Sequence, residues 1–61
     1  MSKFIITNKK GLFKKEVIEV YTPEEALKKI AENTIQIREE YVNGMAVVSK
    51  NDLIEMVEQK N

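Results

Sequence analysis

Hydrophobic and polar positions change their spacing several times along the chain, and the first segments read as a β-hairpin. Residues 3–8 are rich in aromatic and β-branched side chains, which is typical of a strand. A turn is expected next, because Gly11 can adopt the positive φ that closes a short loop. A second strand is predicted over 12–21, with a bulge or an exposed stretch where the alternation breaks at 14–16.

A second hairpin is predicted in the later part of the chain. Apolar and polar residues alternate over 34–42, as expected for a half-buried strand. The dipeptide Asn43-Gly44 is a strong hairpin signal, and 45–49 is the expected return strand. A two-residue turn at this dipeptide pairs Val42 with Met45.

Each predicted hairpin is followed by a signal for the start of a helix. A hydroxyl residue precedes an acidic residue by three positions, so the two side chains can satisfy free N–H groups at the helix start. The capping pairs are Thr22 with Glu25 and Ser49 with Asp52. Helices are expected over 23–33 and 50–60, each with an apolar face.

These elements predict an α+β fold in a single domain covering 1–61, in which two β-hairpins are each followed by an amphipathic helix (ββα-ββα). The pattern leaves two packings open. The hairpins form one sheet under two helices, or each hairpin and its helix form a unit and the two units pack together.

The composition argues against catalysis. The chain of 61 residues has no histidine and no cysteine, the residue types that most often serve as bases, nucleophiles or metal ligands near neutral pH. The adjacent acids Glu39 and Glu40 fall on opposite faces of a strand, so they cannot share a proton, and both are expected at the surface. We therefore expect no enzyme activity, no metal and no cofactor.

Size and hydropathy favour a self-associating cytoplasmic protein. A 61-residue domain without cysteine has a small core and no disulfide, so oligomerisation is the remaining source of added stability. No apolar run is long enough to span a membrane, and the N-terminus lacks a signal-peptide pattern, so no membrane partner is expected. The bias toward Lys, Glu, Ile and Asn is typical of a low-GC bacterium or its phage.

Charge is unevenly distributed although the chain is formally neutral. Residues 1–20 carry five lysines and two glutamates, a balance of +3, and the remainder carries −3. The lysine-rich first hairpin is a candidate surface for an acidic partner. Its lysines are Lys9, Lys10, Lys14 and Lys15. The alternative interpretation is a nucleic-acid-binding surface, although Arg38 is the only arginine.

The segment from Ala46 to Leu53 resembles the end of a cystathionine-β-synthase (CBS) motif. In that family a strand, a hydroxyl residue and a following Asp-Leu begin the last helix. The resemblance implies that Ser49 and Asp52 contact an adenosyl ribose, which makes nucleotide binding a second form of the alternative. The middle of the motif is shorter here and its Pro-Val-Val-Asp stretch is absent.

The strongest positive indication of function is apolar surface beyond what one small core absorbs. If alternate residues of the second hairpin face the helices, then Val42, Met45 and Val47 lie on the opposite face. We therefore predict a non-enzymatic protein–protein interaction module that forms a homodimer, with regulation or inhibition of a larger protein as one role. Those three residues are the predicted contacts.

Overall fold

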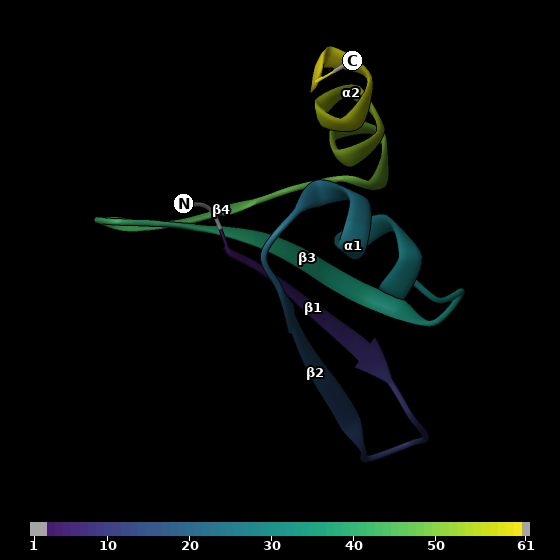
Figure 1. Ribbon diagram of the computed structural model, residues 1–61. Helices are drawn as coiled ribbons and strands as arrows, with labels where there is room; N and C mark the ends of the chain where they lie inside the picture. The colour runs from purple at the N-terminus through teal and green to yellow at the C-terminus, as the bar shows by residue number, and fades with distance from the viewer. Residues whose placement is uncertain (1–2, 61) are drawn as a thin grey trace.

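The chain forms a small α+β fold with a four-stranded antiparallel sheet and two helices (Figure 1). The computed structural model describes residues 3–60. In chain order the elements are β1 (Lys3–Lys9), β2 (Lys15–Val20), α1 (Pro23–Lys29), β3 (Thr34–Tyr41), β4 (Gly44–Val47) and α2 (Lys50–Lys60). Both hairpins belong to one sheet in the order β2-β1-β3-β4, so the packing of two separate units is excluded.

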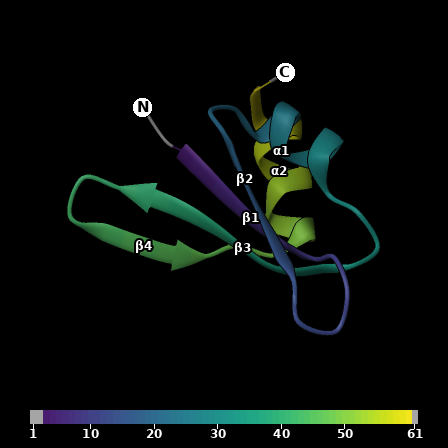
Figure 2. The same ribbon diagram turned by 90° about the horizontal axis from the view of Figure 1, so that it is seen from below.

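Both helices lie on the same face of the sheet (Figures 1 and 2). Alternate residues of the central strand β1, Phe4 and Ile6, are buried beneath them, and α1 packs against α2. The core draws on every element except β4, to which Val48 is the following residue. Its buried apolar residues are Phe4, Ile6, Val20, Ala26, Ile37, Val48 and Leu53. The opposite face of the sheet has no helix over it among the described residues.

Helix α1 begins as the sequence predicts but ends early. The Glu25 N–H donates to Thr22 Oγ1 at 3.1 Å, and Pro23 occupies the first turn, where its missing N–H is harmless. The predicted end at residue 33 is wrong, because the helix stops at Lys29. Beyond it, Thr34 Oγ1 accepts from the Ala31 N–H at 3.2 Å and lies 2.6 Å from the Ala31 carbonyl oxygen, which diverts both groups from helical bonding.

The predicted second strand over 12–21 is too long. β2 begins at Lys15, because the Lys10 N–H donates to the Lys14 carbonyl at 2.9 Å and closes a loop over residues 10–14. Leu12 and Phe13 therefore project from a loop. Of the bulge or exposed stretch expected at 14–16, the exposed stretch is present at Lys14 and Lys15, and the register shift falls between β1 and β3 at Thr7/Asn8.

The predicted register of the second hairpin is displaced by two residues. Met45 pairs with Glu40 instead of Val42, so the turn is centred on Val42-Asn43. This register places the small Ala46 opposite the buried Glu39. A shift of two residues keeps every side chain on its predicted face. Strands β3 and β4 accordingly end at residues 41 and 47, earlier than predicted.

Among the described residues, the search for a helix both long and apolar enough to cross a bilayer found none.

Candidate functional site

The uncovered face of the sheet carries charged residues at its centre and apolar residues near both edges. Lys3 Nζ lies 2.9 Å from Glu40 Oε2 on β3 and 3.8 Å from Glu19 Oε2 on β2, which links three neighbouring strands. The hydrogen bond with Glu40, aided by the charge of Glu19, raises the pKa of Lys3. These pairs neutralise the middle of the face, and they leave Val17, Met45 and Val47 exposed toward its edges.

Two of the three predicted contact residues lie on this face. Met45 and Val47 on β4 are opposite Glu40 and Arg38 on the uncovered side, with exposed fractions of 52% and 69%. Val42 is 99% exposed but lies in the hairpin turn, because of the displaced register. We call these three residues the β4 patch. Figure 2 shows that β3 and β4 extend together away from the helices, so the patch lies on a projecting arm.

The two edge strands of the sheet differ in charge. β4 has the sequence Gly-Met-Ala-Val and carries no charged side chain. β2 carries Lys15, Glu16 and Glu19 among its six residues. Charged side chains on an edge strand hinder pairing with another chain, whereas an uncharged edge leaves its free backbone groups accessible. The edge at β4 is therefore the better surface for adding a strand.

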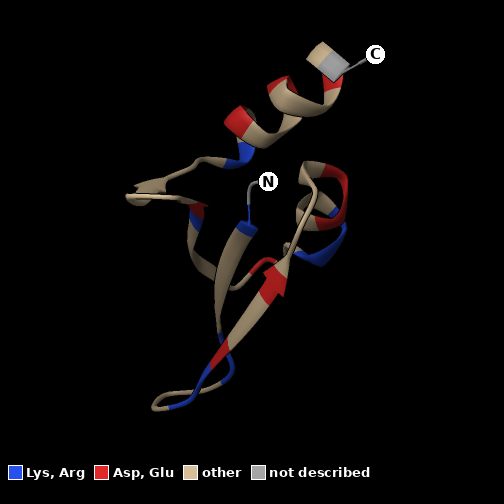
Figure 3. Ribbon diagram, turned by 60° about the vertical axis from the view of Figure 1, so that its left-hand side comes forward, with Lys and Arg blue, Asp and Glu red and all other residues tan. Residues whose placement is uncertain are grey.

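The four lysines of the first hairpin gather at one end of the molecule. Lys9 is the register partner of Lys15, and Lys10 and Lys14 face each other across the loop. Figure 3 shows the two basic stretches of this hairpin on either side of a short uncharged tip. Lys10 Nζ pairs with Glu16 Oε1 at 3.5 Å. In the described residues no carboxylate lies within 4.0 Å of the other three ammonium groups.

Ser49 and Asp52, the residues of the CBS-like segment, bind each other. The Asp52 N–H donates to Ser49 Oγ at 3.1 Å, and the Ser49 N–H donates to Asp52 Oδ2 at 3.1 Å. This reciprocal arrangement is a capping box at the start of α2. The spacing of the hydroxyl and the acid is thus explained by helix capping.

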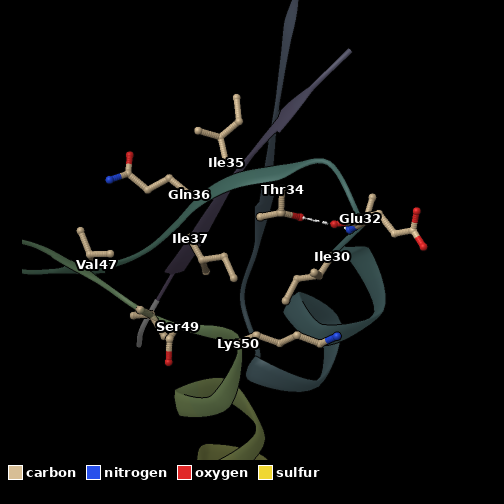
Figure 4. Close-up of a pocket in the computed structure, with 11 residues that line it drawn as sticks. Ile30, Glu32, Thr34, Ile35, Gln36, Ile37, Val47, Ser49 and Lys50 are labelled. Atoms are coloured by element: carbon tan, nitrogen blue, oxygen red, sulfur yellow. Dashed lines mark hydrogen bonds between the residues drawn. The ribbon is translucent and has the colours of Figure 1, made fainter. Parts of the chain in front are cut away.

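A shallow depression adjoins Ser49, between β3 and the start of α2 (Figure 4). Ile30, Ile37 and Val47 line it together with Ser49 and Lys50. Its ionisable lining side chains are Glu32 and Lys50, which do not form an ion pair in the described part of the chain. The Ser49 hydroxyl in its lining accepts from the Asp52 N–H as part of the capping box.

Glu39 is the site residue whose environment the sequence did not reveal. Predicted at the surface, it is only 8% exposed, with Phe4 and Ala46 as its register partners, and its Oε2 accepts from the Tyr41 hydroxyl at 2.9 Å. The available signal was the spacing: residues two apart on a strand share a face, so Tyr41 can reach Glu39.

We expect the Glu39 carboxylate to raise the pH at which the Tyr41 hydroxyl ionises. The hydrogen bond to Glu39, followed by burial and the charge of Glu39, raises the pKa of Tyr41 above its ordinary value of 10.0. The resulting stabilisation is complete below pH 10.0 and is lost as the pH rises through the raised value. A Tyr21→Phe background leaves Tyr41 as the sole tyrosine. In this background the tyrosinate absorbance should rise with a midpoint above pH 10.0. Adding Glu39→Gln should lower the midpoint, and an unchanged midpoint would contradict the assignment.

Among residues 3–60 no group of three or more acidic side chains is placed to hold a metal ion. Comparison with protein-family models, curated proteins and solved structures found no significant match.

Proposed function

We propose that this protein acts by binding, as a small interaction module that forms a homodimer through the edge of β4. The observation that carries the proposal is the uncharged edge strand, which has two large apolar side chains on its uncovered face. In this arrangement the β4 strands of two copies run antiparallel across a two-fold axis. The two sheets then join, and the β4 patches meet on one side of the joint.

The chemistry of the surface favours a second copy as the occupant. In an isologous contact the same patch of both copies meets itself, so residue i of one copy contacts residue j of the other and the reverse. A patch made only of apolar side chains is self-complementary in such a contact. β4 offers only apolar side chains to such a contact, whereas β2 would place the charged side chains of Lys15, Glu16 and Glu19 in it. The formal net charge of zero also leaves no overall repulsion between copies.

The size of the core supports the same proposal. Seven apolar residues are buried in the described chain, a small core for a 61-residue domain. A domain of this length buries about 60% of the surface of its unfolded chain, and oligomerisation is a common source of further burial. A role as regulator or inhibitor of a larger protein would use the same β4 patch.

We expect Val47→Glu to convert the dimer to a monomer. Val47 lies on the uncovered face of β4, so the substitution would place a glutamate from each copy in a small apolar joint, while the monomer core is untouched. Native mass spectrometry should show a species of twice 7.1 kDa for the natural chain and of 7.1 kDa for the variant. Circular dichroism should be unchanged.

The matched control is Val17→Glu, on the same uncovered face but at the β2 edge. Val17 is 61% exposed, similar to Val47 at 69%, and the same charge is introduced. This variant should remain a dimer. A monomeric natural chain, or equal dissociation of both variants, would contradict pairing at β4.

A further inference from the structure

The loop between β1 and β2 places two large apolar side chains in solvent. Leu12 is 83% exposed and Phe13 is 97% exposed, and they are adjacent at the loop tip. The base of the loop is anchored, because the Lys9 N–H donates to the Asn33 carbonyl at 3.0 Å and the Lys10 N–H donates to the Lys14 carbonyl. The apolar tip is therefore held outward on a hydrogen-bonded support.

Four lysines surround this tip in an arrangement that opposes folding. Lys9 and Lys15 are direct cross-strand partners, and like charges in such positions destabilise a sheet. The loop backbone brings Lys10 and Lys14 together in the same way, and Glu16 compensates only one of the four. This concentration of positive charge makes no contribution to the core, which indicates an external anionic partner.

We propose that this loop docks on an anionic lipid bilayer. Leu12 and Phe13 enter the boundary between headgroups and acyl chains, and the four lysines contact the lipid phosphates. The order of the layers matches the bilayer, because the apolar side chains are outermost and the ammonium groups lie behind them, at headgroup depth. Lysine suits this role, since attraction to an anionic surface depends on charge and not on the bidentate geometry that arginine supplies.

The shape of the molecule permits the approach of a flat surface. The loop extends from one end of the sheet, away from both helices and from the β3–β4 arm (Figures 1 and 2). The site is independent of the proposed dimer edge, because β2 and β4 are the opposite edges of the sheet. The sequence-based expectation of no membrane partner rested on the length of apolar runs, which concerns spanning and not surface docking.

Nucleic acid fits this loop less well than lipid. Bases stack on aromatic rings that lie along a basic groove, usually with arginine nearby. Here Phe13 is at a projecting tip, and Arg38 is on the sheet opposite Ile5 and Val47. An acidic protein or nucleic acid would be held by the lysines alone, so it would not depend on Leu12 and Phe13.

A tryptophan reporter tests insertion directly. The chain has no tryptophan, so Phe13→Trp introduces a single fluorophore at the loop tip. With vesicles of phosphatidylcholine and phosphatidylglycerol in a two-to-one ratio, its emission should shift to the blue and be quenched by brominated acyl chains. Tyr21→Trp, at a site 62% exposed directly after the far end of β2, is the matched control and should show neither change.

Vesicle flotation tests the residues that bind. Leu12→Ser with Phe13→Ser should weaken binding to the anionic vesicles by at least about tenfold, and each lysine-to-glutamine change by about fivefold. Ile54→Ser, at an exposed apolar site on α2, should bind as the natural chain does. Absence of binding to anionic vesicles would overturn the proposal. Binding that survives the double serine variant would also overturn it, because the lysines alone would then hold the anionic partner, as expected for an acidic macromolecule. Neither readout measures the oligomeric state. Failure of the lipid proposal is therefore distinguishable from failure of the proposed dimer.

Discussion

Replacing Phe4 with alanine is expected to abolish the cooperative unfolding transition of this protein. Phe4 is 1% exposed on the central strand β1, between Val20 and Glu39 on the neighbouring strands. Removing a buried phenylalanine ring costs about 3–5 kcal/mol, the sum of lost burial and the cavity that remains. A domain of 61 residues has a total stability of roughly 3–9 kcal/mol, so this single change removes most or all of it.

The measurement is urea unfolding followed by circular dichroism. The chain has two phenylalanines, and Phe13→Ala is the matched control, because Phe13 is 97% exposed and the same atoms are removed. That control should change the free energy of unfolding by less than about 0.5 kcal/mol. Similar losses for the two variants would contradict the assignment of the core face of β1.

Thr34→Val is expected to produce the second large loss of stability, because one hydroxyl joins three segments. Thr34 Oγ1 lies 2.9 Å from Asn8 Oδ1 and 2.6 Å from the Ala31 carbonyl oxygen, and it accepts from the Ala31 N–H. Its single hydrogen serves one of the two acceptors at a time. Valine keeps the branched shape and leaves the buried Asn8 side chain, 4% exposed, without this partner. We expect a loss of about 1–3 kcal/mol.

Thr7→Val is the control for this prediction. Thr7 lies one residue from Asn8 on the other side of β1, facing the uncovered side, so the same substitution there should be neutral within about 0.5 kcal/mol. A double-mutant cycle with Asn8→Ala isolates the contribution of the pair. Strictly additive losses for Thr34→Val and Asn8→Ala would show that the two side chains are not coupled.

Elements with local signals were predicted well from the sequence. The start of α1 depends on Thr22, Pro23 and Glu25, which are neighbours in the chain, and the cap of α2 depends on Ser49 and Asp52. Alternation also placed Met45 and Val47 on the uncovered face, since the period of two survives a register shift of two residues.

Features that depend on distant partners were not predictable in this way. The end of α1 at Lys29 follows from Thr34, which belongs to the next strand. The burial of Glu39 was not predicted, because a charged side chain on a strand is ordinarily solvated, whereas Glu39 lies on the core face with Phe4 and Ala46 as its register partners. Leu12 and Phe13 were assigned to a strand because their side chains are typical of strands, whereas the loop closure between Lys10 and Lys14 sets them outside it.

The order of the strands has a consequence for how the chain folds. Each hairpin joins strands that are close in sequence, but the centre of the sheet pairs Lys3 with Glu40, which are 40 − 3 = 37 positions apart. Closing that long loop costs entropy before the core contacts form, so it limits the folding rate more than the helices or the hairpins do. During synthesis the first hairpin and α1 leave the ribosome before β3, and Phe4 and Ile6 gain their central partner strand only when it follows. The nascent chain therefore leaves Phe4 and Ile6 without this partner strand until β3 has emerged.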